Sequence, residues 1–214
     1  MSDLRKSPEL LDRLVLDLKP VRRIPRLGEV LPTVGIPALG AAMLLLAGVF
    51  HFRADLLSAG DHPFFLLSSA IWLISFFGVL RLTYLSAVPG GLGHRRSALG
   101  LVFFIILQFV CLAFAPGREF LEGLAVSGLG CSLSLTILSI LPILILLVLT
   151  RRMAPLNPAH TLRLCVATGG AAGAFALAFH CGGENVGHLL AYHFGPILLL
   201  MAVLPYCFSR VLRW

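Results

Sequence analysis

The stretch "LAFHCGGENVGHLLAYHF", residues 177–194, contains five side chains with metal-binding or redox chemistry: His180, Cys181, Glu184, His188 and His193. Imidazoles, thiolates and carboxylates bind borderline metals, and a thiolate is also the group that oxidants attack. The spacing matches no standard zinc module, and residues five apart do not stack on one face of an α-helix. We therefore expect transient capture of a thiophilic metal or thiol oxidation, with no permanent metal and no cofactor.

Long apolar segments lie on both sides of this stretch. The chain has 214 residues, is 58% hydrophobic and has a mean hydropathy of +0.94. A bilayer core about 30 Å thick needs roughly 20 apolar residues per helix. Six stretches are long enough: 31–50, 64–88, 97–115, 124–150, 162–180 and 188–208. The short alternating strands of a membrane barrel are absent, so the sequence predicts an all-α, polytopic bundle of six transmembrane helices.

The basic residues predict the orientation of this bundle. Fifteen of the 17 Lys and Arg residues fall on the side of the two termini, and only Arg53 and Arg118 fall on the other. By the positive-inside rule, both termini then face the cytoplasm of a bacterium, with the protein in the inner membrane. The first apolar run follows 30 polar residues, so we expect no cleaved signal peptide. The net charge of +7 is explained by topology, and we expect no direct contact with nucleic acid.

Residues 1–30 form a polar tail ahead of the transmembrane bundle expected over residues 31–214. Within "SPELLDRLVLDLKP", Ser7 and Pro8 are typical of a helix start. One face of the predicted helix is apolar: Leu10, Leu11, Leu14, Val15 and Leu18. Surface-bound membrane helices usually have a basic polar face, whereas this one carries Asp12 and Asp17 as well as Arg13. We therefore expect a short amphipathic cytoplasmic helix that docks on the membrane surface, on its own bundle or on another protein, and the mixed polar face favours the protein partner.

Two cysteines are matched in depth. Cys131 lies 25 residues before Leu156, the centre of the turn between the fourth and fifth spans, and Cys181 lies 25 residues after it. Equal rise along two antiparallel helices places both sulfur atoms at the same outward height, and Gly130, Gly182 and Gly183 are expected to let the backbones approach. A paired, reactive role and a role as small apolar filler both fit this spacing.

The sequence disfavours several other classes of protein. No Asp or Glu lies within the six spans, which argues against an ion-coupled transporter. A membrane thiol oxidoreductase that exchanges electrons with quinone is the main alternative, because it would use the same outward cysteines. The CxxC pair favoured by such enzymes is absent. A haem-binding membrane protein that uses His188 or His193 is a third possibility.

Four motifs carry a family resemblance. "LDRLVLDLKPVRRIPR" before the first span, "TRRMAPLNP" after the fourth, "FHC" closing the fifth and the terminal "RVLRW" occur in this order. Together they resemble the NrsF family, negative regulators of sigma-F-type extracytoplasmic-function (ECF) sigma factors. The resemblance extends over essentially the whole chain. Gly182 and Tyr192 depart from it, since the family commonly has Pro and Trp at these positions.

The resemblance implies an integral-membrane anti-sigma factor rather than an enzyme. Such a protein holds its ECF sigma factor at the inner membrane, through the cytoplasmic tail and loops, and releases it under stress. The sensing cysteines implied are Cys131 in "GLGCSL" and Cys181 in "FHCGG", and the stimulus is a heavy metal or thiol oxidation in the periplasm. Nearby groups with a possible accessory role are His180, Glu184, His188, His193 and Cys111.

Overall fold

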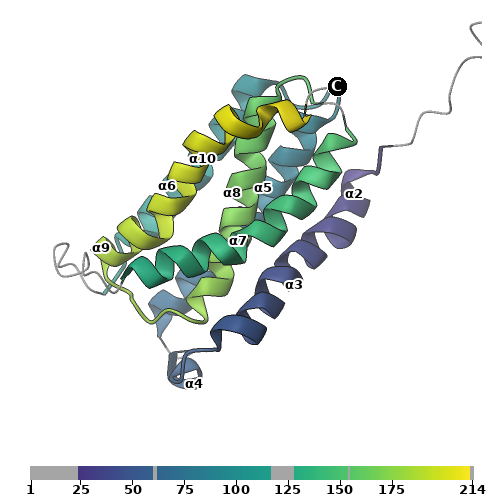
Figure 1. Ribbon diagram of the computed structural model, residues 1–214. Helices are drawn as coiled ribbons and strands as arrows, with labels where there is room; N and C mark the ends of the chain where they lie inside the picture. Colours follow the sequence, from purple (N-terminus) through teal and green to yellow (C-terminus); the bar gives the residue numbers. More distant parts are fainter. Residues whose placement is uncertain (1–23, 60–61, 117–127, 154, 213–214) are drawn as a thin grey trace, which may run out of the picture.

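The computed structural model describes residues 24–59, 62–116, 128–153 and 155–212. This part of the chain is helical and contains no β-strand (Figure 1). The amphipathic helix expected in the tail, with its apolar face of Leu10, Leu11, Leu14, Val15 and Leu18, lies outside the described residues.

Within the described ranges six helices are long and apolar enough to cross a membrane, which confirms the predicted six-helix bundle. Four are continuous: α5 (Pro63–Ala87), α6 (His94–Leu112), α7 (Gly128–Arg151) and α8 (Pro158–Ala178). The first spans Leu27–Phe50 and consists of α2 (Leu27–Val30), η2 (Leu31–Gly35), α3 (Ile36–Leu45) and η3 (Leu46–Phe50). The sixth spans Val186–Phe208 and consists of α9 (Val186–His188), η5 (Leu189–Phe194) and α10 (Gly195–Phe208). The short helices α4 (Leu56–Ala59) and η6 (Ser209–Leu212) complete the described chain.

The surface around the sides of the bundle is apolar, as a lipid-facing surface must be. Large side chains with more than half of their area exposed occur on several spans, among them Leu44, Leu99, Leu133 and Leu199. A water-soluble protein rarely exposes apolar patches over so many of its helices. Together with the six apolar helices, this surface identifies a membrane protein.

Helix α8 runs through the middle of the bundle (Figure 1). In its most apolar window 83% of the residues are buried, a larger share than in any other described span. Its small residues allow α7 to approach closely. A Cβ added at Gly169 would meet the Ile143 backbone nitrogen at 3.0 Å, and one at Gly173 would meet the Ser139 backbone nitrogen at 3.1 Å. The small-xxx-small pair of α8 is therefore a contact surface for α7.

Buried polar side chains link the helices at three levels. Thr83 Oγ1 of α5 lies 2.9 Å from Thr168 Oγ1 of α8. Gln108 Nε2 of α6 donates to Ser75 Oγ of α5 at 3.0 Å. Near the end of the bundle where α6 begins, Ser97 Oγ and His160 Nε2 lie 2.7 Å apart, which joins α6 to α8. Such pairs satisfy polar groups that the lipid cannot hydrogen-bond.

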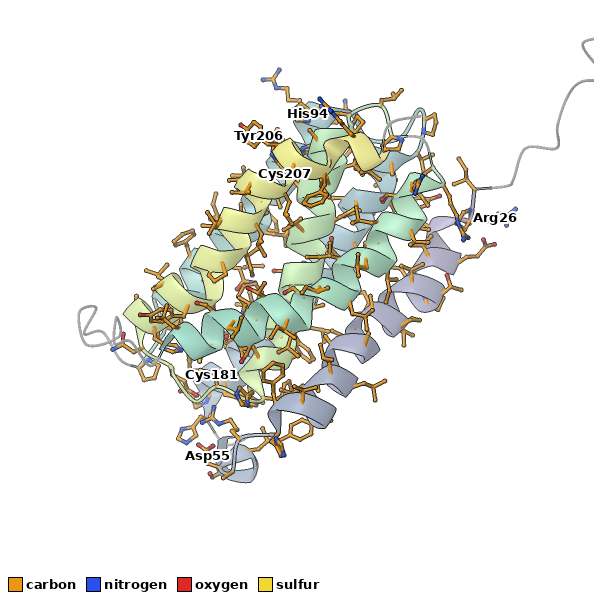
Figure 2. All side chains as sticks on the ribbon, viewed as in Figure 1. Arg26, Asp55, His94, Cys181, Tyr206 and Cys207 are labelled. Atoms are coloured by element: carbon orange, nitrogen blue, oxygen red, sulfur yellow. The ribbon has the colours of Figure 1, made fainter. Side chains whose placement is uncertain are left out.

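The two ends of the bundle differ in chemistry. Figure 2 shows Cys181 and Asp55 at one end and Arg26 and His94 at the other. At the basic end, the Tyr84 hydroxyl donates to the Pro25 carbonyl at 2.8 Å, which attaches the chain ahead of α2 to α5. The polar tail therefore joins the bundle at the end opposite the thiols.

Candidate functional site: a thiol and imidazole cluster

Cys131 and Cys181 meet at one end of the bundle. Cys131 lies in the first turn of α7, and Cys181 lies three residues beyond the last residue of α8. Both are free thiols, and their Sγ atoms are 3.1 Å apart. The expected proximity of the two sulfur atoms is confirmed. Their sensing role stays a prediction.

The glycines near the cysteines have different roles from those expected. A Cβ at Gly130 would meet no heavy atom within 4 Å, so this glycine is not what allows the sulfur atoms to approach. A Cβ at Gly183 would lie 2.7 Å from Cδ2 of the His188 ring, and one at Gly182 would lie 3.3 Å from the Arg53 guanidinium. The two glycines after Cys181 therefore make room for His188 and Arg53.

His188 and His193 lie beside the sulfur atoms and beside each other. His188 Nε2 is 3.2 Å from Cys181 Sγ, and the two imidazole centroids are 5.4 Å apart. The expectation that a five-residue separation keeps these histidines off a common face is wrong. The intervening segment η5 is a π-helix, in which the Gly195 amide donates to the Leu190 carbonyl five residues earlier. A turn of this kind brings residues five apart onto one face.

A proline follows the point at which the helix widens. Pro196 has no N–H, and in an α-helix its ring would clash with the carbonyl four residues earlier, which is that of Tyr192. Ser132 Oγ of α7 donates to this carbonyl at 3.4 Å. A partner on the neighbouring helix thus replaces the missing backbone donor. Upstream, the Asn185 side chain caps α9 by accepting from the Gly187 amide at 2.8 Å.

Four possible ligand atoms gather in this cluster. One atom each from Cys131, Cys181, His188 and His193 lies within 4.8 Å of all the others. The hydrogen bond with Cys131, followed by the one with His188, lowers the pKa of the Cys181 thiol below its ordinary value. His193 is only 3% exposed, and its Nε2 has no hydrogen-bond partner among the described residues. The arrangement can bind a soft or borderline cation or form a disulfide.

Three other residues expected near the site lie outside the cluster. His180 Nδ1 is 2.9 Å from the His51 carbonyl oxygen. Glu184 pairs with Arg53, with Oε1 and Nη1 separated by 3.6 Å. Cys111 is buried in the core near the end of α6.

Arg53 is a site residue that sequence reasoning missed. Its guanidinium makes two hydrogen bonds to Asp55, of 2.7 and 2.6 Å, and its backbone amide donates to the Phe179 carbonyl at 2.9 Å. The hydrogen bonds from Arg53 lower the pKa of Asp55 to about 2. Together with its pairing to Glu184, these contacts attach the loop after the first span to the loop that carries Cys181. One feature of the sequence could have indicated it: Arg53 is one of only two basic residues on the side predicted to face outward.

The fold and the cluster define a polytopic helical membrane protein with paired thiols and imidazoles at one end of its bundle. Among known protein families, residues 14–214 match NrsF, described as "Negative regulator of sigma F". Because the match extends over nearly the whole chain, the protein belongs to this family, and the resemblance noted in the sequence is confirmed. The family comprises regulators of a sigma factor and is not a class of enzymes. No curated protein and no solved structure matches the chain.

Proposed function

We propose that this protein is an inner-membrane anti-sigma factor that binds an ECF sigma factor at its cytoplasmic face and releases it when Cys131 and Cys181 are modified. Family membership supports the sigma factor as partner. The observation that carries the sensing role is the 3.1 Å separation of the two sulfur atoms. They lie at the end of the bundle opposite Arg26 and His94 (Figure 2).

The distribution of charge supports the orientation. Fifteen of the 17 Lys and Arg residues belong to the tail, loops and helix ends assigned to the side of the termini. That side faces the cytoplasm under the positive-inside rule. The cysteine pair then faces the periplasm, where disulfides form and persist and where external metals arrive first.

Oxidation provides one signal. A thiolate of the pair attacks an oxygen of a peroxide such as H2O2 and becomes a sulfenic acid, and the second oxygen leaves as water after protonation. The other thiol then displaces the sulfenic oxygen as a second water, and a disulfide forms. The pair loses two protons and two electrons, and the peroxide takes up both. A thiophilic cation provides the other signal, since it displaces the two thiol protons without electron transfer.

The neighbouring helices offer a route from the thiols to the other end of the bundle. Cys131 is on α7 and Cys181 follows α8, so either signal changes how these two helices are held at their outer ends. Gly169 and Gly173 keep α7 and α8 in contact further along. The loop between them begins after Arg151 and carries the basic residue Arg152. For a signal to release the sigma factor, the cytoplasmic ends of α7 and α8 must have two arrangements, one that binds the sigma factor and one that does not. The signal must stabilise the second arrangement more than the first.

The tail is the proposed docking segment for the sigma factor. Its predicted apolar face is formed by Leu10, Leu11, Leu14, Val15 and Leu18. An isolated helix of about three turns is marginal in water, so docking would stabilise it. The end of the tail reaches the bundle at the basic end, where the Pro25 carbonyl accepts from the Tyr84 hydroxyl.

A crosslinked capture of the tagged protein from native membranes tests the partner. We expect a sigma factor to co-purify with the full-length chain and to be lost when Leu11 and Leu14 are both replaced by Glu. Replacing Asp12 and Arg13 by Ala, on the opposite face, is the matched control and should retain the sigma factor. Absence of any sigma factor from a full-length capture would contradict the proposal.

The sensing step needs its own test. In cells exposed to peroxide or a thiophilic metal, Cys131→Ser combined with Cys181→Ser should keep the sigma factor on the membrane, whereas Cys207→Ser should release it like the wild type. Unchanged stress induction of the target genes in the double variant would reject the cysteine pair as the sensor. Quinone reduction by the purified protein would instead favour the thiol oxidoreductase.

A further inference from the structure

The cluster of Cys131, Cys181, His188 and His193 has the donor set of a structural metal site. Zn²⁺ is commonly held by two thiolates and two imidazoles in a tetrahedron, with Zn–S of about 2.3 Å and Zn–N of about 2.0–2.1 Å. These bond lengths place neighbouring ligand atoms roughly 3.3–3.8 Å apart. In the described structure the two Sγ atoms are 3.1 Å apart, Cys181 Sγ is 3.2 Å from His188 Nε2, and no pair in the cluster exceeds 4.8 Å. Shifts of about 1 Å convert this arrangement into a tetrahedron.

A second observation, independent of these distances, points to a ligand at the same place. His193 is 3% exposed, and its Nε2 is a buried polar atom without a hydrogen-bond partner among the described residues. Buried polar atoms in proteins are nearly always paired, so an unpaired ring nitrogen beside two thiols needs an explanation. A cavity of about 20 Å³, the size of a water molecule, borders the cluster and is lined by two of its four residues, Cys181 and His193.

The charges of the cluster select the class of ion. Two thiolates neutralise a divalent cation, so the loaded site has no net charge and is tolerated near the apolar bundle. The Glu184 carboxylate is already paired with Arg53. Thiolate and imidazole ligands suit Zn²⁺ and similar cations, whereas Mg²⁺ and Ca²⁺ prefer oxygen. Binding releases the two thiol protons and involves no change in oxidation state.

We propose that Cys131, Cys181, His188 and His193 form a four-ligand tetrahedral site for a divalent cation of the Zn²⁺ class. This differs from the transient metal capture expected from sequence spacing, because the chain through α9 and η5 places two imidazoles beside the thiols. The proposal deepens the proposed function by naming the ligand class and ligand set of its sensor. The ion and a Cys131–Cys181 disulfide exclude each other, since both use the same two sulfur atoms.

Co²⁺ titration of the full-length, reduced and metal-free protein in detergent tests the site. Tetrahedral coordination with two thiolates produces visible d–d bands and an ultraviolet thiolate-to-cobalt band, so the coordination geometry and the thiolate ligands each have a spectral signature besides affinity. We expect one Co²⁺ per chain, displaced by one Zn²⁺. His188→Ala and His193→Ala should each weaken binding by on the order of 10–100-fold or more and change the visible bands.

His180→Ala is the matched control, because His180 is adjacent to Cys181 but lies outside the cluster. It should bind Co²⁺ as the wild type does. Size-exclusion chromatography of every variant tests folding. His188 is only partly buried, so we expect His188→Ala to disturb the fold less than His193→Ala does. Absence of Co²⁺ binding to the reduced wild type would overturn the proposal. So would wild-type affinity and spectra in both histidine variants.

These outcomes are separable from failure of the proposed function. Sigma-factor capture from membranes requires no added metal and tests the regulator directly. If capture succeeds and depends on the cysteines while both histidine variants bind Co²⁺ normally, the four-ligand site is rejected and the anti-sigma function stands. If Co²⁺ binding behaves as expected and no sigma factor is captured, the site is supported and the anti-sigma function is rejected.

Discussion

His188 and His193 are five residues apart, and their imidazole centroids are only 5.4 Å apart. On an α-helix, residues five apart diverge by about 140° around the axis. The π-helical segment Leu189–Phe194 removes this divergence and turns both rings toward Cys181. A local departure from α-helical geometry therefore assembles the cluster, which agrees with the frequent occurrence of π-turns at functional sites.

The first prediction concerns the cysteine pair. Mild oxidation of the purified protein with peroxide should link Cys131 to Cys181, because their sulfur atoms already lie 3.1 Å apart. Mass spectrometry of non-reduced peptides would detect the linked pair. Cys111→Ser should leave the crosslink unchanged, and Cys131→Ser should abolish it. A crosslink from Cys181 to Cys111 in place of Cys131 would contradict the geometry.

The second prediction concerns the space around His188. Gly183→Ala should displace the His188 ring, because the new Cβ would lie 2.7 Å from Cδ2 and 2.8 Å from Nε2. We expect Co²⁺ affinity to fall roughly tenfold, at the lower end of the range for a disturbed ligand shell. Gly130→Ala is the control, since its Cβ meets no heavy atom within 4 Å. Equal affinity of the two variants would show that Gly183 does not position the ring.

The third prediction concerns the Arg53 clamp. Arg53→Gln should accelerate alkylation of Cys181 by a few-fold, because it releases Glu184 and weakens the link between the two outward loops. Labelling with a maleimide, followed by peptide mass spectrometry, measures the rate. Arg53→Lys separates charge from geometry, since Lys keeps the charge but lacks the guanidinium fork that binds Asp55. A rate for Arg53→Gln equal to that of the wild type would exclude the clamp.

The pH dependence of this clamp follows from Asp55. Its pKa is lowered from the ordinary 3.8 to about 2 by the hydrogen bonds from Arg53. A lowered carboxyl pKa contributes stability that is fully present well above 3.8 and is lost as the pH falls toward about 2. The ratio of alkylation rates between Arg53→Gln and wild type should therefore stay constant from pH 5 to pH 8. A ratio that rises steeply within that range would show that another group controls the loop.

The bundle and the cysteine pair were predictable from the sequence, because both follow from rules that need no knowledge of how the helices pack. Apolar length determines which segments cross the lipid, and constant helical rise matches the depth of Cys131 and Cys181. The histidine pair was not predictable from the same rules, because the spacing rule assumes α-helical turns throughout. We expect the widening at η5 to depend on Pro196 and on the hydrogen bond from the Ser132 hydroxyl of another helix to the Tyr192 carbonyl. That contact appears only when α7 and the last span are packed.

Contacts between distant segments escaped sequence reasoning in a similar way. Arg53 binds groups on both sides of Cys181, namely the Phe179 carbonyl and Glu184, and no local pattern predicts that pairing. The expected role of Gly130 was wrong for the same reason. Gly130 is next to Cys131 in the sequence, but its Cα does not face a neighbouring helix, so a Cβ there would meet no heavy atom within 4 Å. Gly128, two residues earlier, is the glycine whose missing side chain accommodates the Tyr192 ring.

The fourth prediction concerns the contact between α7 and α8. Gly173→Ala should destabilise the bundle by about 1–3 kcal/mol, because its Cβ would press on backbone atoms, the Ser139 nitrogen and the Leu135 carbonyl oxygen. Unfolding in mixed micelles with increasing denaturing detergent measures the change. Gly40→Ala in α3 is the control and should be near neutral or stabilising, since its Cβ meets nothing within 4 Å. An equal loss of stability in both variants would indicate a general effect of the added methyl group and not a specific contact between α7 and α8.

The final prediction concerns the cause of the π-helical turn. Pro196→Ala restores a backbone N–H that can donate to the Tyr192 carbonyl, which now accepts from Ser132. The segment can then narrow toward an α-helix, and His193 should rotate away from Cys181. We expect Co²⁺ affinity to fall about as far as in His193→Ala, with the visible bands changed in the same way. Pro205→Ala, in the same span but toward its other end, is the matched control and should bind Co²⁺ normally. Normal binding by Pro196→Ala would mean that packing against α7, rather than the proline, maintains the turn.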